Sequence, residues 1–365
     1  MATFLEALRQ KNTLSPVLLR RSDIRGVGIG YADPSKPSHG AAVIVYTRKK
    51  IISTDITKLI RTTLGREFPI RMISTGAFRP HGTTTKVKRK LTRKLRPTLF
   101  RSRIRPVPGG TSIGRVNPFS TGTAGLITIK NNQLYILSNN HVLIRGNSPA
   151  FSPTVQPGPA DGGQLASDRV GQAFEFIPFN LTGVNFMDAA IASPLNNSNS
   201  LFNPRYLMDA AGTLITVPGH LNSYRVGETF IKSGRTTGSI TGTVESIGVD
   251  SRVGPYAELG GAVLLFRNQT IIVGPVIGGD SGSVWLRQSD RFAAALLFAG
   301  SENRSVNTPI GSVMSTFGLR VAIPASKGGF RSGAVKGWAP HGNFAYVRPL
   351  MASQRKRIKA ILVRK

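Results

Sequence analysis

A serine surrounded by glycines is the part of the sequence best suited to chemistry. The segment VIGGDSGSVW, residues 276–285, sets Ser281 between an aspartate and a glycine, after two further glycines. Attack on a carbonyl needs a hydroxyl on a tight turn and N–H donors that converge on the developing oxyanion. Gly278, Gly279 and Gly282 allow such a turn because no Cβ restricts them. We therefore predict that the N–H groups of Gly279 and Ser281 form an oxyanion hole, although the same cluster also suits a plain turn.

A histidine and an aspartate elsewhere in the chain could complete such a site. His141 follows the apolar strand of LYILSNNHVL, and Asp188 leads into the apolar run DAAIAS. An imidazole can take the proton of a serine hydroxyl, and a buried carboxylate can orient that imidazole. Taken singly, these residues also fit a polar strand end and a turn cap. Asp161 and Asp168 are rivals for the acid, but Asp188 is favoured because it enters a strand, whereas Asp161 lies in a Gly/Pro loop.

In these three segments the chain resembles the trypsin-like (chymotrypsin-fold) serine proteases. It is most similar to the bacterial members that lack disulfides and carry an extra N-terminal module. The resemblance implies a double six-stranded β-barrel, with His141 as general base and then acid, Asp188 as its orienting partner and Ser281 as the nucleophile. It also implies that Gly300, in the segment FAGS, lies on the strand that pairs with a substrate backbone. It implies no metal and no organic cofactor.

The pattern of strands divides the chain into four parts. Residues 108–323 read as short apolar strands separated by turns, with a helix at 308–318, and form the expected peptidase domain. Residues 1–77 form a small α+β module, with strands at 26–31, 41–47 and 69–75 and a helix at 54–65. A basic, proline-containing linker (78–107) and a basic Gly/Ser-containing tail (324–365) complete the chain.

The charge of the chain points to a polyanionic partner. With 48 Lys and Arg against 17 Asp and Glu, the formal net charge is +31, far beyond what solubility requires. The segment 79–105 holds eleven basic residues and no acidic one, so we expect an extended arm, exposed to cutting by the enzyme itself or by another protease. Six of its residues are predicted to bind nucleic acid or another polyanion without regard to sequence: Lys88, Arg89, Lys90, Arg93, Lys94 and Arg96.

Several classes of protein are disfavoured by what the sequence lacks. There is no cysteine, which excludes disulfides and thiolate metal sites. The start of the chain does not have the charged head and apolar core of a secretory signal, and no apolar run is long enough to span a bilayer. We therefore expect a soluble, cytoplasmic protein, and the sequence does not fix its oligomeric state.

Two functions of different classes follow. The first is a serine endopeptidase that acts on a protein or peptide substrate. The alternative is a polyanion (nucleic acid) binding protein on a protease scaffold, with no cleavage or only self-directed cleavage. The complete set of serine, histidine and aspartate favours the endopeptidase, because a scaffold kept for binding alone has no need of all three.

Overall fold

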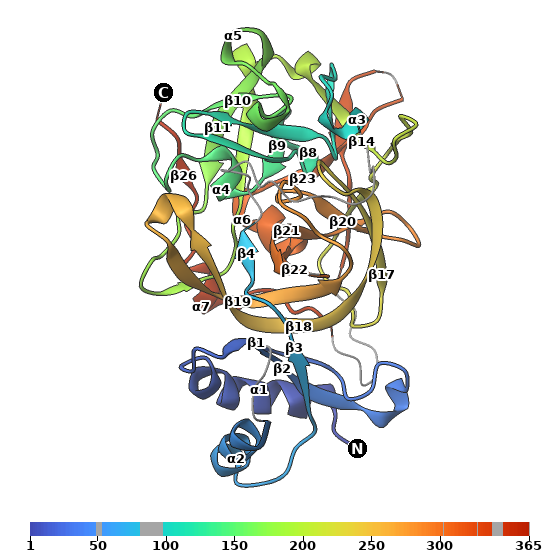
Figure 1. Cartoon of the computed structure of the whole chain (residues 1–365). Helices are drawn as coiled ribbons and strands as arrows, with labels where there is room; N and C mark the ends of the chain where they lie inside the picture. Colours follow the sequence, from blue (N-terminus) through green and yellow to red (C-terminus); the bar gives the residue numbers. More distant parts are fainter. Residues whose placement is uncertain (49–52, 81–97, 302, 327, 338–345, 365) are drawn as a thin grey trace.

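A computed structural model describes residues 1–48, 53–80, 98–301, 303–326, 328–337 and 346–364. The protein is mainly β, as predicted, with two large sheets in the upper and middle parts of Figure 1 and the N-terminal helices below them. No helix among the described residues is long and apolar enough to cross a membrane.

The N-terminal part contains one helix that the sequence pattern did not reveal. The predicted strands, helix and third strand are confirmed as β1 (Ile24–Tyr31), β2 (Ala41–Thr47), α2 (Ser53–Leu64) and β3 (Ile70–Ser74). They are preceded by α1 (Phe4–Leu18), whose first turn is closed by a capping box between Thr3 and Glu6. Leu14 and Leu18 of α1 are buried against β1, β2 and α2.

These N-terminal elements share a sheet with the rest of the chain. Strand β1 pairs antiparallel with β2 on one side and with β18 (Gly238–Tyr256) on the other. Two polar contacts reinforce this union, since the Lys11 ammonium lies 2.7 Å from Asp250 Oδ2 and the Ser15 hydroxyl donates to the same oxygen over 2.7 Å. Residues 1–77 are therefore joined to β18 by both backbone pairing and buried polar groups.

The first large sheet contains six strands whose pairings form a ring. They are β17 (Thr229–Gly234), β18, β19 (Ala262–Val273), β22 (Arg304–Pro309), β21 (Ala293–Ser301) and β20 (Val284–Arg287). Pairing proceeds in that order, and β20 pairs with β17 again. Shorter strands pair with members of this ring or with one another: β4 (Arg79–Pro80) and β16 (Gly219–Leu221) with β21, β12 (Val184–Asn185) with β19, and β25 (Ala334–Lys336) with β16.

The second large sheet follows an open order over the described residues. Its strands, in that order, are β24 (Phe330–Ser332), β23 (Arg320–Pro324), β8 (Leu126–Lys130), β9 (Gln133–Ser138), β13 (Ala190–Pro194), β11 (Arg169–Phe176), β10 (Pro153–Val155), β6 (Ser112–Val116) and β7 (Phe119–Thr123), and β26 (Ile361–Leu362) pairs with β11. A third, small sheet joins β15 (Leu214–Ile215), β14 (Phe202–Leu207) and β5 (Val107–Gly109).

Short helices connect these strands. The α-helices are α3 (Thr98–Arg101), α4 (Asn140–Leu143), α5 (Leu165–Asp168), α6 (Ile310–Phe317) and α7 (Ala352–Arg355). The 3-10 turns are η1 (Pro37–His39), η2 (Pro159–Asp161), η3 (Leu195–Asn197), η4 (Asn199–Leu201) and η5 (Ala257–Leu259). Helix α6 confirms the helix predicted at 308–318 and ends at Gly318, whose left-handed conformation a glycine adopts without strain.

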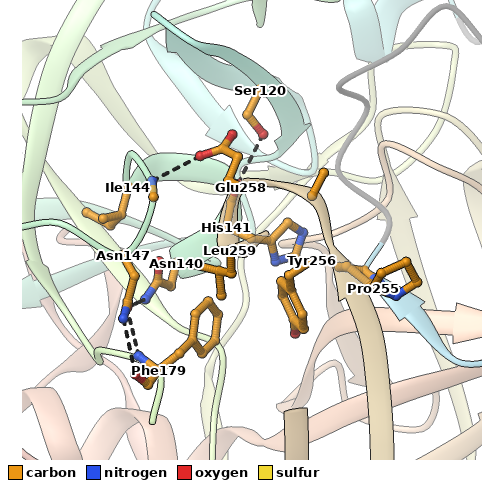
Figure 2. A pocket seen from close by; sticks show the side chains of 13 residues that line it. Ser120, Asn140, His141, Ile144, Asn147, Phe179, Pro255, Tyr256, Glu258 and Leu259 are labelled. Atoms are coloured by element: carbon orange, nitrogen blue, oxygen red, sulfur yellow. Dashed lines mark hydrogen bonds between the residues drawn. The ribbon is translucent and has the colours of Figure 1, made fainter. Parts of the chain in front are cut away.

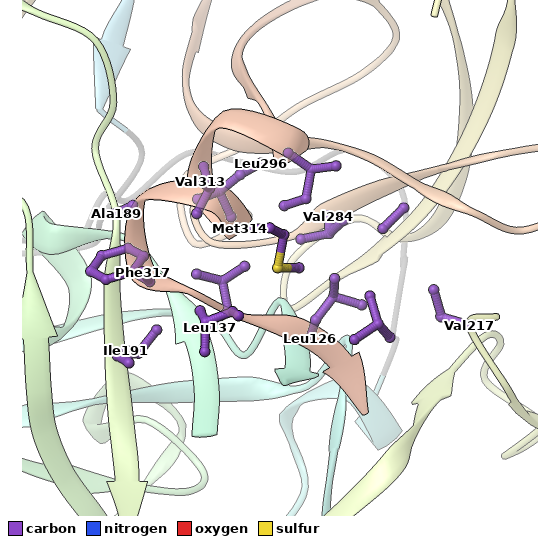
Figure 3. Close-up of a cluster of buried hydrophobic side chains, with 14 of the residues drawn as sticks. Leu126, Leu137, Ala189, Ile191, Val217, Val284, Leu296, Val313, Met314 and Phe317 are labelled. Carbon is purple, nitrogen blue, oxygen red and sulfur yellow. The ribbon is translucent and has the colours of Figure 1, made fainter. Parts of the chain in front are cut away.

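The apolar core between the two large sheets adjoins the segments that contain His141, Asp188 and Ser281. Figure 3 shows side chains from both sheets and from α6 meeting in one apolar cluster. Leu137 lies four residues before His141, Ala189 follows Asp188, and Val284 lies three residues after Ser281; all three are buried in this cluster. Since each fully buried side chain of the size of leucine contributes about 1.5–3 kcal/mol, the packing of this core fixes the ends of the strands from which the site is built.

The basic linker expected at 78–107 is packed at both of its described ends. Phe78 and Phe100 are each 1% exposed, and the N–H of Gly254 donates to the Phe78 carbonyl oxygen over 2.9 Å. The two aromatic rings account for the difference from an extended arm, because burying them removes a large apolar area from water. The six basic residues predicted to bind a polyanion, between Lys88 and Arg96, lie outside the described residues.

A buried histidine in β16 is expected to make the fold sensitive to acid. His220 is 4% exposed, and burial, aided by the nearby Arg320 charge, lowers the pKa of its imidazole to about 4. The unfolded chain, with a histidine pKa near 6.5, then binds more protons than the native one between pH 6.5 and 4. Stability is therefore lost as the pH falls through this window, by about 2–3 kcal/mol at pH 4.5.

Urea unfolding of His220→Gln and the wild type tests this expectation. The variant should lose less stability than the wild type between pH 7.5 and 4.5, whatever its stability at pH 7.5. Parallel losses in the two proteins would show that His220 does not set the acid limit.

Candidate active site

His141 and Asp188 lie in direct contact. His141 belongs to α4, the single helical turn that follows β9, and Asp188 lies two residues before β13, which pairs with β9. The Nδ1 atom of His141 is 2.5 Å from Asp188 Oδ2, and the backbone N–H of His141 donates to Oδ1 over 3.3 Å. Asp188 has no exposed surface. The pairing of adjacent strand ends thus produces the imidazole–carboxylate arrangement that the sequence predicted.

Three polar residues hold this pair in place. The Asn139 side-chain amide donates to the Asp188 carbonyl oxygen over 2.7 Å, and that of Asn140 donates to the carbonyl oxygen of Ile177, also over 2.7 Å. The Tyr256 hydroxyl donates to Asp188 Oδ2 over 3.3 Å, and its ring packs edge-on against that of His141. Burial and the Asp188 charge raise the pKa of Tyr256 well above its usual value, so the phenol remains a donor.

The two rival acids are occupied elsewhere. Asp161 accepts two bonds from the Arg235 guanidinium, over 2.7 and 2.5 Å. Asp168, at the end of α5, accepts a bond from Arg103 Nε over 2.9 Å. Asp188 is the acid that contacts His141, and the reason for preferring it, its position at the entry of a buried strand, agrees with its place in the structure.

Ser281 lies on a turn that requires glycine at two positions. Gly279 and Gly282 have φ angles of +101° and +92°, in the region that side chains with a Cβ disfavour. A Cβ on Gly282 would also lie 2.2 Å from the Ser138 hydroxyl at the end of β9. The serine turn therefore packs closely against the strand that leads to His141.

One strand connects the histidine turn with the serine turn. In β7 the Ser120 hydroxyl donates to the His141 carbonyl oxygen over 3.1 Å. Three residues further along the same strand, the Thr123 N–H donates to the Ser281 carbonyl oxygen over 2.7 Å. Three residues of a strand span about 10 Å, so these contacts place the histidine turn and the serine turn at opposite ends of a short stretch of β7.

A buried ion pair joins Lys232 to Asp280, the residue before Ser281. Asp280 and Lys232 have no exposed side-chain surface, and their charged atoms lie 3.5 Å apart. Asp280 also accepts the backbone N–H groups of Thr236 and Thr237 (3.0 Å each) and of Ile277 (3.1 Å). Burial works to raise the pKa of Asp280, but Lys232 and these N–H donors hold it below its usual value. The carboxylate thereby joins the start of the serine turn to the connection between β17 and β18.

The Ser281 hydroxyl is not hydrogen-bonded to His141 in this conformation. It donates instead to the Phe298 carbonyl oxygen over 3.1 Å. The Nε2 atom of His141 is buried and has no hydrogen-bond partner over the described ranges. Ser281 has no exposed surface, so its hydroxyl is not open to solvent in this conformation.

Threonine hydroxyls hold two consecutive peptide groups of the serine turn, and the first of these carries the Gly279 N–H predicted for the oxyanion hole. The Gly278 carbonyl oxygen accepts the Thr236 hydroxyl over 2.7 Å, and the Gly279 carbonyl oxygen accepts the Thr123 hydroxyl over 3.0 Å. In a trans peptide the N–H points opposite to the carbonyl. The Gly279 N–H therefore points away from Thr236, and its orientation is fixed before any substrate arrives.

A pocket of about 100 Å³ adjoins the imidazole. Figure 2 shows the His141 and Tyr256 rings on one side of it and Phe179 and Leu259 on another. Pro80 of β4 also lines it. Its walls are mostly apolar, as in sites that bind a side chain by excluding water.

Two residues of the site were missed from the sequence. Tyr256 ends the 19-residue strand β18, and Lys232 lies in β17. No local motif marks either one, because their partners Asp188 and Asp280 lie 68 and 280 − 232 = 48 positions away along the chain. The nearest signal for Lys232 is a lysine within an otherwise apolar run, TFIKSG.

No grouping of three histidine, aspartate or glutamate side chains suited to a metal ion occurs among the described residues.

No protein-family model and no curated protein matched the chain. Among solved structures, it is similar to a glutamic acid specific serine protease, with 19% identity over 59% of this chain and 100% of that chain and a TM-score of 0.41. It is also similar to protease A of Thermobifida fusca (20% identity, 62% and 99% covered, TM-score 0.43) and to a chymotrypsin of Cellulomonas bogoriensis (20%, 59% and 97%, 0.41). At these TM-scores the similarity does not bear on the activity of this protein.

Proposed function

We propose that the protein is a serine endopeptidase that hydrolyses peptide bonds through an acyl-enzyme on Ser281. The observation that carries the proposal is the 2.5 Å contact between His141 Nδ1 and the fully buried Asp188. A buried carboxylate on Nδ1 fixes the tautomer that leaves Nε2 free to accept a proton. A histidine that served only as a polar strand end would have no need of this partner.

The proposed reaction proceeds in two halves. The Ser281 oxygen attacks the substrate carbonyl while His141 Nε2 takes the hydroxyl proton, and the resulting oxyanion accepts bonds from the N–H groups of Gly279 and Ser281. The imidazolium then gives its proton to the leaving amine as the C–N bond breaks. Water attacks the acyl-enzyme in the second half, with the same proton transfers in reverse order. Asp188 stabilises the imidazolium throughout.

Engagement of the site needs one local change. The Ser281 hydroxyl must leave the Phe298 carbonyl oxygen, which it now contacts over 3.1 Å, and turn toward the imidazole. A serine hydroxyl has three staggered positions about χ1 that interconvert readily, and catalytic hydrogen bonds often form only when the substrate is bound. The observed bond is therefore compatible with a resting form of the site.

The substrate class proposed is a protein or peptide. Gly300 lies near the end of β21, and its backbone faces β22 on one side, where it pairs with Ser305. On the other side, beyond Leu296, β20 no longer pairs with β21. An extended peptide can add to such an edge through main-chain hydrogen bonds.

Polyanion binding remains the second candidate function. The observation in its favour is the net charge of +31, which attracts nucleic acid without regard to sequence. Because the six arm residues lie outside the described part of the chain, this function remains a prediction from composition. It is compatible with catalysis, and it becomes the leading function only if Ser281 is inert.

Labelling with a fluorophosphonate separates the two functions. The reagent bonds to a serine oxygen activated by a neighbouring base, so the wild type should be labelled and Ser281→Ala should not. Ser283→Ala is the matched control, since it removes another buried hydroxyl two positions away and should leave labelling intact. If the reagent labels Ser281 neither in the wild type nor in variants that free the edge of β21, the endopeptidase proposal is wrong.

A further inference from the structure

A segment of the N-terminal region occupies the free edge of β21. Residues Arg79 and Pro80 form β4, which pairs antiparallel with Gly300 and Ala299. Strand β22 pairs along the opposite edge of β21, from Ala295 to Ser301, so β4 takes the edge that β20 vacates after Leu296. In Figure 1, β4 rises from β3 into the middle of the molecule, beside β21. This is the same edge that the proposed function assigns to the substrate backbone.

Contacts before β4 anchor the segment. The Thr75 hydroxyl donates to the Ser301 hydroxyl oxygen over 3.2 Å, and Thr75 is 2% exposed. Phe78 is 1% exposed and packs edge-on against the Tyr46 ring of β2. The Phe78 carbonyl oxygen accepts the Gly254 N–H over 2.9 Å. Thus a buried ring against β2, one hydrogen bond to β21 and one hydrogen bond to β18 hold the segment in place, in addition to the strand pairing.

The direction and position of β4 are those of a ligand of the active site. As the chain runs from Arg79 to Pro80, its partners run from Gly300 to Ala299, toward Phe298, whose carbonyl oxygen accepts the Ser281 hydroxyl. Pro80 lines the apolar pocket beside His141 and Tyr256. Ser281 has no exposed surface in this conformation.

We propose that Arg79 and Pro80 are a built-in occupant of the substrate edge of β21, which keeps other peptides from Ser281 until the segment is displaced. The inference rests on the proposed function, because it assigns a regulator to that same site. The chain thereby carries its own competitive ligand, with the proline in the pocket next to His141. Activation consists of releasing β4, so that a substrate can bind and the Ser281 hydroxyl can turn from the Phe298 carbonyl oxygen toward His141.

The expected size of the effect follows from the population of the open form. A ligand tethered within the same chain acts at an effective concentration of the order of millimolar. If the segment is in place nine-tenths of the time, the apparent affinity for an outside substrate falls about tenfold, and at ninety-nine hundredths about a hundredfold. Freeing the edge should raise kcat/KM by one of these factors.

Two substitutions release the segment by different means. Pro80→Asp places a charge in the apolar pocket beside His141, where burial is costly. Phe78→Ala removes the buried ring that anchors the segment. Both proteins, as full chains, should hydrolyse fluorescein-labelled casein with a kcat/KM at least about tenfold above the wild type. The synthetic peptide STGAFRP, residues 74–80, should then inhibit Pro80→Asp competitively.

The control and the labelling experiment keep the outcomes distinct. Pro324→Asp changes a half-buried proline at the end of β23 and should leave casein hydrolysis at the wild-type rate. If the released variants are labelled at Ser281 by fluorophosphonate yet hydrolyse casein no faster than the wild type, β4 does not block the site and the inference is overturned. If no protein is labelled, the endopeptidase proposal itself has failed. Should Phe78→Ala not fold, Pro80→Asp and the peptide still decide the question.

Discussion

Replacing Asp188 by asparagine is expected to lower kcat by about 10⁴ while the protein remains folded. The carboxylate contacts His141 Nδ1 over 2.5 Å and the His141 backbone N–H over 3.3 Å. An asparagine amide preserves the shape but can present an N–H to Nδ1, which favours the tautomer with its proton on Nε2. That nitrogen then cannot accept the Ser281 proton, and the negative charge that stabilises the imidazolium is lost as well.

Asp168→Asn is the matched control for this substitution. Asp168 is also an acid at a strand entry, but its partner is Arg103 and it does not contact His141. We expect casein hydrolysis and the rate of fluorophosphonate labelling to fall in Asp188→Asn and to be unchanged in Asp168→Asn. Equal activity of the two variants would mean that the His141–Asp188 contact is structural, and the proposed mechanism would be withdrawn.

Replacing Lys232 by methionine is expected to disable the serine turn and to destabilise the fold. Removing one partner of a buried ion pair costs about 3–5 kcal/mol, because the other charge is left buried and uncompensated. Here that charge is Asp280, which lies next to Ser281 and fixes the N–H groups of Thr236, Thr237 and Ile277. As the turn shifts, the N–H donors of the oxyanion hole move, and the loss of one such donor lowers kcat by about 10²–10³.

A second buried lysine provides the comparison. Lys11 pairs with Asp250 over 2.7 Å and is 4% exposed. It lies in α1, the first helix of the chain, and not beside the serine turn. Lys11→Met should reduce the free energy of unfolding without lowering kcat. If Lys232→Met retains its kcat at a temperature where it is folded, the ion pair does not position the turn.

The double variant Lys232→Met/Asp280→Asn separates charge from hydrogen bonding. Removing both charges should recover much of the lost stability, since the isolated buried charge is gone. Activity should not recover to the same extent. An asparagine has one acceptor oxygen in place of two, whereas Asp280 accepts Thr236 and Thr237 at Oδ1 and Ile277 at Oδ2.

The residues that the sequence alone identified carry local signals. Ser281 lies among glycines that a tight turn requires, and the structure gives two of them positive φ angles. His141 and Asp188 each adjoin a buried strand, so the pairing of β9 with β13 brings them together. The strands at 26–31 and 41–47 were predictable from short apolar runs, and the helix at 308–318 from its early proline and closing glycine.

The residues that escaped prediction depend on distant pairings. Tyr256 reaches Asp188 only because β18 ends beside His141, and Lys232 reaches Asp280 only because β17 pairs with β20 next to the serine turn. Periodicity does not report which strands become neighbours. The same holds for β4, whose two residues form a strand solely because β21 offers an unpaired edge.

Strand β18 has a consequence for any shorter form of the chain. At Ile247–Ser251 it pairs with β19 on one side and with β1 on the other. Loss of the N-terminal elements would bare a row of main-chain donors and acceptors along β18, together with Asp250, whose partners Lys11 and Ser15 would be gone. Such an exposed edge is a template for the strands of other molecules. A chain that has lost its N-terminal elements would therefore be prone to self-association through β18.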